Sequence, residues 1–414
     1  MPGKLDNMKK VDVIFSANLN SIIGPVQTLK RIVSNRPFFL ENDYDLTLFT
    51  LDNPGGTQSL SSSLANSVAK RNQSFIAKKT KELARFFAQH SFWYDALRIK
   101  KLLAAPSGLV QQYCSMVREP QVIVFHYIYD CYCYLKQAKE VKAKIVLFIH
   151  ADSTKSSMLL EYFPKAKGTA VERKLDDITQ LVLDKVDRVI SISKIGAKNF
   201  LREHPELEGR VGVVVNGIDD ITTDQLQYVE ETRKKPNTKK YRLISCGTVN
   251  GRKGQWIVVD ALCKLPPKIL DDIEYTIVGD GPQKVTLEAA VERNGLKNVH
   301  FVGSVPNVEV YKYLAEANIA ILMSSNEGLP LSLIEALRCG LAGISTRVAG
   351  IPEVMVDGHN GILIERSVEA LNELLLHISD YDWEAMGQKS RNLFKDEYTF
   401  SRMKNDYLQM LQTL

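Results

Sequence analysis

Short runs of β-branched and apolar residues alternate with helical segments in both halves of the chain, and this alternation constrains the fold more than any other feature. In the first half the apolar runs lie at Val11–Ala17, Leu46–Leu51, Gln121–His126, Ala143–His150 and Arg188–Ile192. In the second half they lie at Arg242–Gly247, Glu274–Gly279, His300–Val302, Ile319–Met323 and Ala342–Thr346. Helical patterns fall between them at Gly254–Lys264, Lys284–Asn294, Val308–Glu316 and Pro330–Cys339. Strand, helix and strand in repeated order predict parallel sheets that helices cover on both faces.

The length of 414 residues favours two or three domains, because one domain usually takes roughly 100–200 residues. A parallel sheet in each half predicts an α/β protein with two Rossmann-like domains that face each other across a cleft, the first over residues 1–218 and the second over residues 219–398. The polar, lysine-rich stretch Asp219–Tyr241 predicts a linker or an exposed first turn at this boundary. Ligands of such domains bind beyond the carboxyl ends of the strands, so functional residues are expected in the loops that follow strands.

Charge is distributed unevenly along the chain. Residues 1–218 carry 31 Lys and Arg against 21 Asp and Glu, a net charge of +10, whereas residues 219–414 carry 22 against 27, a net charge of −5. Opposite signs indicate either two domains with different partners or a difference in solvated surface charge that has no function. The hydrophobic fraction of 45% and the charged fraction of 24% exclude a wholly disordered chain.

Cysteine usage and apolar run lengths bear on the compartment. The six cysteines have no regular spacing apart from Cys131-x-Cys133, which excludes a disulfide framework. The first residues contain no long apolar stretch of the kind a secretory signal needs. The longest apolar runs are far shorter than the roughly 20 residues of a membrane-spanning helix. We therefore expect a reduced, cytoplasmic protein.

The block Ser324–Ala336 is the most informative part of the sequence. It follows an expected strand, and Pro330 suits the first turn of a helix, where a missing N–H is harmless. Glu327 then lies in the strand-to-helix loop and Glu335 in the second helical turn. Two carboxylates so placed accept hydrogen bonds from ligand hydroxyls, while the helix N-terminus between them favours an anion. A sugar at one carboxylate, a ribose at the other and a diphosphate at the helix start would fit this pattern. An isolated glutamate pair at this spacing is, however, more often structural.

With its flanks, this block resembles the family 4 retaining glycosyltransferases of the GT-B fold, whose signature pairs two glutamates separated by seven residues, as Glu327 and Glu335 are. The resemblance runs from about Arg242 to Glu365. Further family motifs stand in the family's order at Ser245–Gly247, Lys253–Gly254, Ile277–Pro282, Asn298–Gly303, Ala349–Glu353 and Gly358–Gly361. The resemblance implies donor binding by the second domain and a carboxyl-terminal helix, residues 399–414, that returns to the first domain.

The resemblance also implies roles for individual residues. Glu335 is expected to hold the donor ribose, Glu327 to face the donor sugar, and Lys253 to lie against the diphosphate. The expected catalytic residues are His150, Glu327 and Lys253. The expected donor-binding residues are Gly24, Arg252, Lys253, Gly279, Val302, Gly303, Glu327, Gly328, Leu329, Leu331 and Glu335. A fixed cation at the diphosphate stabilises the charge that grows on the leaving group as the glycosidic bond breaks.

The chain departs from the family at the end of its first strand in the second domain. The family usually has an arginine directly after the strand-end glycine, and this chain has Thr248 after Gly247. Arg252, next to Lys253, is the expected source of the second cation, from a different place on the backbone.

The amino-terminal half carries a weaker resemblance. The family's glycine-rich loop corresponds to Asn18–Val26, in which Gly24 is the residue that permits close backbone approach. His150 ends an expected strand, where a family histidine faces the reacting sugar. A neutral ring there accepts a hydrogen bond and a charged ring supports a phosphate. His126 also ends a strand and is the competing candidate.

The function implied by the resemblance is a retaining transfer of a hexosyl or N-acetylhexosaminyl group. The donor is a nucleotide diphosphate sugar, with UDP favoured, and the acceptor hydroxyl belongs to a glycan, lipid-linked intermediate or protein in cell-surface polysaccharide or glycoconjugate synthesis. No cofactor and no essential metal are expected, because the Asp43–Asp45 triplet precedes a strand and is interpreted as a turn. Two alternatives stay open: a nucleotide-sugar epimerase, and a non-catalytic GT-B subunit that binds a glycan or a partner.

A basic segment lies at residues 70–101, where aromatic residues such as Phe86, Phe87 and Trp93 are interleaved with lysine and arginine. Such a segment fits peripheral contact with an anionic membrane, at its inner face, as well as it fits a core-packing helix with a solvated face. Nucleic acid is not expected as a partner.

Overall fold

The structure, a computed structural model, describes residues 8–19, 24–57, 92–150 and 164–414. It divides into two compact units. The first unit comprises Met1–Ile192, Ala197–Val214 and Tyr407–Leu414, and the second comprises Ser193–Gly196 and Val215–Asp406. Both are α/β units built on a mainly parallel sheet, which is the fold class expected from the sequence.

The first unit is built on a seven-stranded sheet with the order β3-β2-β1-β4-β5-β6-β7. Its strands are β1 (Lys9–Phe15), β2 (Tyr44–Thr50), β3 (Asn53–Thr57), β4 (Val122–Phe125), β5 (Lys144–Ile149), β6 (Arg188–Ser191) and β7 (Val211–Val213). All pairings are parallel except β2 with β3, which is antiparallel at the edge of the sheet. The edge strand β3 was not expected, because its sequence Asn-Pro-Gly-Gly-Thr has the composition of a turn.

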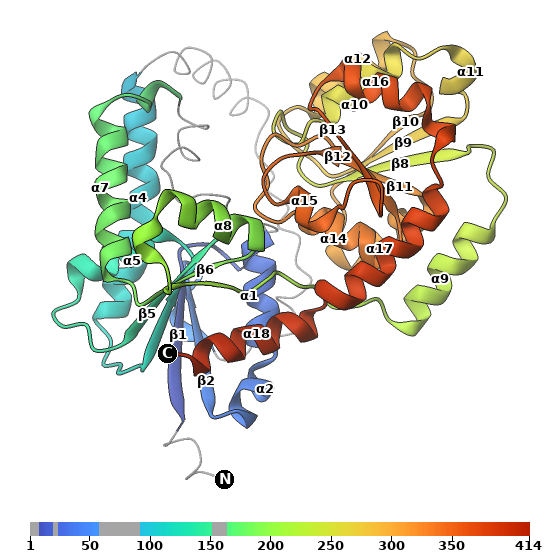
Figure 1. Ribbon diagram of the computed structural model, residues 1–414. Helices are drawn as coiled ribbons and strands as arrows, with labels where there is room; N and C mark the ends of the chain where they lie inside the picture. The colour runs from blue at the N-terminus through green and yellow to red at the C-terminus, as the bar shows by residue number, and fades with distance from the viewer. Residues whose placement is uncertain (1–7, 20–23, 58–91, 151–163) are drawn as a thin grey trace. The chain divides into compact units, whose positions relative to one another are not determined.

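Helices cover both faces of this sheet (Figure 1). They are α1 (Gly24–Ser34), α2 (Arg36–Glu41), α4 (Phe92–Cys114), α5 (Ile128–Gln137), α7 (Ala170–Lys185) and α8 (Lys194–Glu203). Alternate residues of β5 show the two faces: Ile145 and Leu147 enter the core cluster formed with α4, α5 and α7. Phe148 points the other way and stacks on Tyr407, at a centroid distance of 5.5 Å, in the carboxyl-terminal helix α18 (Phe400–Gln412).

The second unit is built on a six-stranded sheet with the order β10-β9-β8-β11-β12-β13, and every pairing is parallel. Its strands are β8 (Tyr241–Cys246), β9 (Ile273–Val278), β10 (Val299–Gly303), β11 (Ile319–Leu322), β12 (Ala342–Thr346) and β13 (Gly361–Ile364). The last of these, β13, was not expected, because only four residues pair and two of its side chains are half-buried.

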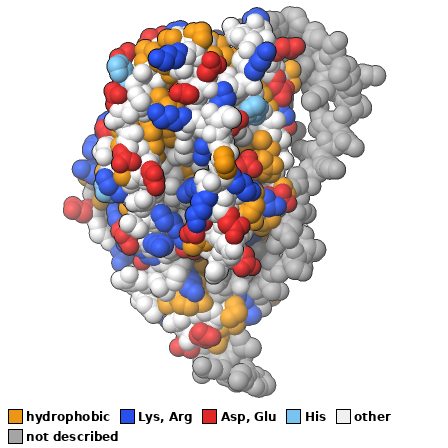
Figure 2. All heavy atoms as spheres, turned by 90° about the vertical axis from the view of Figure 1, so that its right-hand side faces the viewer, with side chains coloured by type: hydrophobic (Ala, Val, Ile, Leu, Met, Phe, Trp, Pro, Cys, Tyr) orange, Lys and Arg blue, Asp and Glu red, His pale blue; other side chains and the backbone are white. Residues whose placement is uncertain are grey.

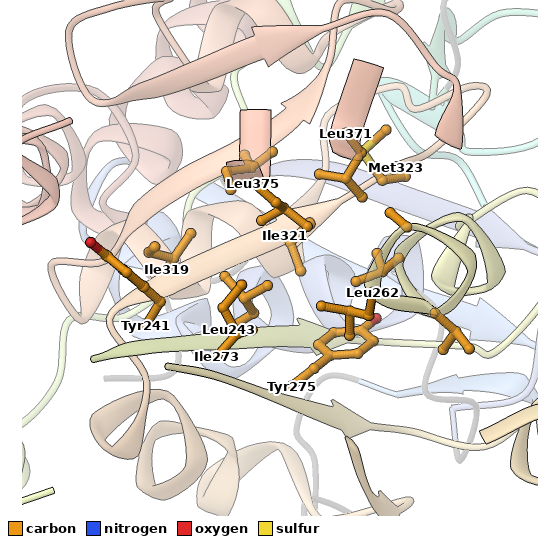
Figure 3. Close-up of a cluster of buried hydrophobic side chains, with 14 of the residues drawn as sticks. Tyr241, Leu243, Leu262, Ile273, Tyr275, Ile319, Ile321, Met323, Leu371 and Leu375 are labelled. Carbon is orange, nitrogen blue, oxygen red and sulfur yellow. The ribbon is translucent and has the colours of Figure 1, made fainter. Parts of the chain in front are cut away.

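The helices of the second unit lie on both faces of its sheet (Figure 1). They are α9 (Thr223–Lys234), α10 (Gln255–Cys263), α11 (Pro267–Leu270), α12 (Lys284–Arg293), α13 (Val310–Glu316), α14 (Leu331–Arg338), α15 (Ile351–Val354), α16 (Val368–Leu376) and α17 (Trp383–Glu397). Figure 3 shows one face of the core, where Leu262 from α10 and Leu371 and Leu375 from α16 pack on Leu243, Ile321 and their neighbours in the sheet.

The expected linker at Asp219–Tyr241 is wrong, because most of this stretch forms helix α9. Its first turn is a capping box, in which the Thr222 side chain accepts from the Gln225 N–H and the Gln225 side chain accepts from the Thr222 N–H. Val229 is buried, and Tyr228 meets Tyr311 of α13 at a centroid distance of 5.7 Å. A helix this polar has a weak apolar stripe, so tertiary packing rather than composition determines it.

The basic segment at residues 70–101 lies largely outside the described residues, and helix α4 begins at Phe92. Leu97 within it is exposed, with 65% of its surface accessible. In the described part of the chain, no helix is both long enough and apolar enough to cross a bilayer. On the face seen in Figure 2, acidic and basic side chains are interspersed rather than gathered into single-sign patches.

Candidate functional site

The order of the second sheet reverses between β8 and β11. From β8 the chain proceeds outward to β9 and β10, and from β11 it proceeds outward in the opposite direction to β12 and β13. Loops that leave the carboxyl ends of two such strands run apart and leave a crevice, which is where open α/β sheets bind ligands. The loops after β8 and β11 carry Lys253 and Glu327, so the two most informative sequence motifs meet at this place.

Backbone contacts hold these two loops together. The Ser325 N–H donates to the Arg252 carbonyl at 2.8 Å. Arg366 bridges the same loops, since its Nε donates to the Met323 carbonyl at 3.0 Å and its guanidinium donates to the Gly251 carbonyl at 2.6 Å. The β8 loop is therefore fixed directly against the end of β11.

Glu327 is the centre of a charged cluster. One of its carboxylate oxygens, Oε1, accepts from Lys253 Nζ at 2.7 Å, from Arg252 at 2.7 Å and from the Ser324 hydroxyl at 2.8 Å. Arg252 also donates to the Asn326 carbonyl at 2.6 Å. The Glu327 side chain is 9% exposed and the Lys253 side chain 11% exposed, so this is a largely desolvated cluster of two cations around one anion. Arg252 and Lys253, the two cations expected at the diphosphate, thus meet at one carboxylate oxygen. Thr248 is exposed.

The electrostatics of Glu327 follow from these contacts. Burial alone raises the pKa of this carboxyl, and the Lys253 ammonium and the Arg252 guanidinium outweigh that effect, so the pKa lies below its ordinary value. The carboxylate is therefore ionised at neutral pH. It pairs with both cations but balances only one of their two positive charges, so the cluster keeps a net charge of +1 that favours an anionic ligand.

Gly254 has a geometric reason to be glycine. Its φ of +73° is in the left-handed region, and a Cβ there would lie 2.1 Å from the Met323 carbonyl oxygen. The close approach of this residue to the end of β11 sets the position of the neighbouring Lys253. The strand-end contacts are similarly tight at Gly279, where a Cβ would lie 1.9 Å from the Gly247 carbonyl oxygen.

We expect Gly254→Ala to lower the free energy of unfolding by about 3 kcal/mol or more, because left-handed strain of roughly 1–2 kcal/mol adds to overpacking of about 1–3 kcal/mol. Gly358→Ala is the matched control, since Gly358 has a φ of +70° and nothing within 4 Å of its added Cβ. Only the strain of roughly 1–2 kcal/mol is expected there. Equal losses in urea unfolding of the two variants would contradict the close approach at Gly254.

Glu335 lies in the second turn of α14, half-buried, as the sequence predicts. Burial raises the pKa of the Cys246 thiol at the end of β8, the Glu335 carboxylate raises it further, and the Lys253 ammonium opposes the rise. The charges of Glu335 and Lys253 therefore both lie close enough to Cys246 to shift the pKa of its thiol. Helix α14 begins at Leu331, with Pro330 as its N-cap, and the first N–H groups of a helix have no partner within it.

The remaining predicted donor residues stand at two places. Gly328 and Leu329 lie in the loop between Glu327 and α14, with the Leu329 side chain buried. Val302 and Gly303 end β10, and the Gly303 carbonyl accepts from the Gly279 N–H at 2.8 Å. The ends of β8, β9 and β10 thus form one continuous edge in the second unit.

The predicted residues of the first unit lie at a helix start and at a strand end. Gly24 is the first residue of α1, and His150 directly follows β5. His126 directly follows β4, and its Nδ1 lies 2.8 Å from His150 Nε2. The two histidines that the sequence presents as competing candidates are therefore hydrogen-bonded to each other. Burial lowers the pKa of His150 to about 4, and burial together with His150 lowers that of His126 well below its ordinary value.

Within the described ranges, no three His, Cys, Asp or Glu side chains are grouped so that they could hold a metal ion. Asp45, in the triplet interpreted as a turn, pairs with Arg36 at 2.8 Å, and Asp43 has a φ of +67° typical of a turn. Tyr44 and Asp45 themselves belong to β2.

Comparison with known proteins identifies the second unit. Residues 229–403 match the family model of glycosyl transferases group 1, a stretch that contains Arg252, Lys253, Glu327 and Glu335. This stretch is a domain of the group 1 glycosyl transferases, called the group 1 domain below. The group 1 domain is 27% identical over 185 residues to the GPI3 subunit of phosphatidylinositol N-acetylglucosaminyltransferase from Saccharomyces cerevisiae, a match that covers 44% of this chain and 40% of the yeast subunit. It is 30% identical over 160 residues to N-acetyl-alpha-D-glucosaminyl L-malate synthase of Bacillus anthracis, covering 36% of this chain and 39% of that enzyme. The chain therefore matches about two fifths of the length of these relatives.

Solved structures extend the likeness in fold beyond the group 1 domain. HepE of Anabaena, solved with UDP and glucose, has a TM-score of 0.65 at 15% identity and covers 98% of this chain and 100% of its own. At this identity the likeness shows the fold, and it confirms the GT-B fold with its two Rossmann-like domains.

Two residues of the group 1 domain were missed by sequence reasoning. Ser324 is fully buried and donates to Glu327, and its place directly after β11, next to the glutamate block, is a signal that was present in the sequence. Arg366 bridges two loops through carbonyl groups, and a single arginine after a short strand gives no such signal.

Proposed function

We propose that this protein is a retaining glycosyltransferase that moves a sugar from a nucleotide diphosphate sugar to an acceptor hydroxyl. The observation that carries the proposal is the cluster of Lys253, Arg252 and Glu327 at the switch point of the second sheet, beside the N-terminus of α14. Two fixed cations and a free helix N-terminus suit a diphosphate, and Glu335 on the same helix suits a ribose.

In this proposal each residue has a defined task. The diphosphate lies against Lys253 and Arg252, Glu335 accepts hydrogen bonds from ribose hydroxyls, and the loop at Gly328 and Leu329 faces the sugar. As the bond from the anomeric carbon to the diphosphate breaks, the leaving oxygen gains charge that the two cations stabilise more than they stabilise the intact donor. The acceptor oxygen bonds to the anomeric carbon on the same face, and its proton passes to the departing diphosphate.

The donor domain is proposed at residues 219–398 and the acceptor domain at residues 1–218, with residues 399–414 returning to the first. UDP is the favoured nucleotide, which is supported by the UDP complex of HepE. An N-acetylglucosaminyl donor is supported by the names of the yeast and Bacillus anthracis relatives. A lipid-linked acceptor is supported by the name of the yeast relative alone. Membrane contact through residues 70–101, at the cytoplasmic face, is part of the same proposal.

The test is incubation of the purified chain with a panel of nucleotide sugars and candidate lipid and glycan acceptors, with nuclear magnetic resonance analysis of the product. The expected product keeps the anomeric configuration of the donor. Inversion would contradict the retaining assignment. Conversion of the donor to another nucleotide sugar, with no acceptor present, would favour an epimerase.

A second candidate is a non-catalytic subunit that binds a nucleotide, a glycan or a partner protein. It is favoured by one observation: Glu327 pairs with both cations, so these side chains already have a partner within the protein. Tight UDP binding without turnover on any acceptor would support this candidate over the enzyme.

A further inference from the structure

Two histidines of the first unit form a buried, hydrogen-bonded pair. His126 and His150 follow the neighbouring parallel strands β4 and β5, and His126 Nδ1 lies 2.8 Å from His150 Nε2. His126 is 5% exposed. Its ring stacks on Phe148 with a centroid distance of 4.5 Å and an interplanar angle of 16°. Stacking on Phe148 and the hydrogen bond between the rings fix the orientation of the His126 ring relative to His150.

The outer nitrogens of the pair are buried and unsatisfied. Neither His126 Nε2 nor His150 Nδ1 has a hydrogen-bond partner in the structure as described. Buried polar atoms are nearly always satisfied, and an exception at a strand end indicates a place for a ligand or an ordered water. The two outer nitrogens of the pair can therefore form hydrogen bonds with a ligand.

The hydrogen bond between the rings links their protonation. Both rings are neutral at physiological pH, since burial lowers both pKa values. A neutral imidazole has one N–H and one lone pair. If His126 donates through Nδ1, then His150 accepts through Nε2 and must carry its own proton on Nδ1. If His150 donates through Nε2, then His126 accepts through Nδ1 and carries its proton on Nε2. The two rings therefore always share the same tautomer.

We propose that His126 is a positioning residue that sets the tautomer of His150, and thereby decides whether His150 Nδ1 offers a proton or a lone pair to a substrate hydroxyl. The hydroxyl as ligand rests on the proposed transferase function. A hydroxyl both donates and accepts, so it matches either tautomer of the pair, whereas a phosphate oxygen matches only the form with a proton on Nδ1. The contact is therefore suited to a sugar or acceptor hydroxyl.

The tautomers are measured by long-range proton–nitrogen correlation on the full chain labelled with nitrogen-15 histidine. Signals are assigned by their loss in His126→Phe and in His150→Phe. The expected result is the same tautomer in both rings, with no titration of either between pH 6 and 8. Opposite tautomers, or a ring that titrates near pH 6.5, would overturn the inference, and this measurement in the wild-type chain does not depend on activity.

Kinetics test the positioning role. With UDP-N-acetylglucosamine as donor and water as acceptor, His126→Phe keeps the ring that stacks on Phe148 but removes the hydrogen bond. Its kcat is expected to fall about 10–100-fold, the usual effect of losing a group that orients another, with KM for the donor nearly unchanged. His126→Asn places an amide near the former Nδ1 and is expected to restore most of kcat. If His126→Phe does not fold, the tautomer measurement in the wild-type chain still tests the inference.

The outcomes separate the inference from the proposed function. An unchanged kcat in His126→Phe, with UDP bound normally, would overturn the positioning role alone. A wild-type chain that binds no UDP would overturn the proposed function and the hydroxyl ligand with it.

Discussion

Lys253→Gln is expected to lower kcat/KM for the sugar donor about 10²–10³-fold, the usual effect of removing one group that stabilises developing negative charge. Lys253 is the less exposed of the two cations at Glu327, and its ammonium lies 2.7 Å from the carboxylate. Glutamine keeps much of the side-chain length but carries no charge to set against a departing diphosphate. Initial rates over a range of donor concentrations measure the effect.

Lys264→Gln is the matched control for this substitution. Lys264 has the same charge and pairs with Glu369 at 2.9 Å, but both side chains are more than half exposed. Its kcat/KM is expected to match that of the wild-type chain. Since Arg252 still pairs with Glu327 in Lys253→Gln, the loss of stability should stay below the roughly 3–5 kcal/mol that follows removal of one partner of a buried pair. A kcat/KM within about threefold of wild type would contradict the role given to Lys253, because one group aimed at developing charge should contribute more.

Glu327→Gln is expected to abolish most turnover while strengthening the binding of UDP. The amide still reaches Ser324, but it carries no charge to pair with Lys253 and Arg252, which then meet the diphosphate without a competing anion. A release of about 1 kcal/mol of internal pairing corresponds to a roughly fivefold gain in affinity. Isothermal titration with UDP gives the affinity, and donor turnover gives the rate.

Lys253→Gln removes a cation from the proposed diphosphate site and is therefore expected to weaken UDP binding, whereas Glu327→Gln is expected to strengthen it. Weaker UDP binding in both variants would mean that Glu327 holds the nucleotide directly rather than facing the sugar. Unchanged turnover in Glu327→Gln would remove Glu327 from the reaction altogether.

The stability of Glu327→Gln has a defined dependence on pH. The folded pKa of Glu327 lies below its ordinary value of 4.5, so its ionised form stabilises the fold. This contribution is fully present above the unfolded pKa and is lost as the pH falls through the folded pKa. The difference in unfolding free energy between wild type and Glu327→Gln is therefore expected to be constant from pH 6 to 8 and to shrink below pH 4.5. Urea unfolding at several pH values measures it.

Much of the fold could be predicted because buried parallel strands are continuous apolar runs in the sequence. The runs at Val122, Ile145 and Ile319 are apolar on both faces, and each lies in the strand that the structure has there. Strands and helices with little apolar signal were missed. β3 has the sequence of a turn and exists because it pairs with β2, and α9 is polar and exists because it packs on α13.

The residues of the site could be predicted better than their contacts. The family resemblance implied Glu327 and Lys253, and Arg252 was chosen because it adjoins Lys253; the structure brings the three side chains together. Sequence reasoning did not find that one carboxylate oxygen accepts from both cations, since that depends on rotamers and on burial. It treated His126 and His150 as rivals, because strand periodicity does not show which side chains at neighbouring strand ends will touch.

The central claim is that the group 1 domain binds the ribosyl diphosphate of an activated sugar, and thermal unfolding with UDP tests it most directly. At about 100 times its dissociation constant, UDP is expected to add about 2.7 kcal/mol to the stability of the wild-type chain. Glu335→Ala is expected to show no shift at the same UDP concentration, while the surface variant Glu369→Ala responds as the wild type does. A wild-type chain that UDP does not stabilise, or a Glu335→Ala chain that responds undiminished, would contradict the account.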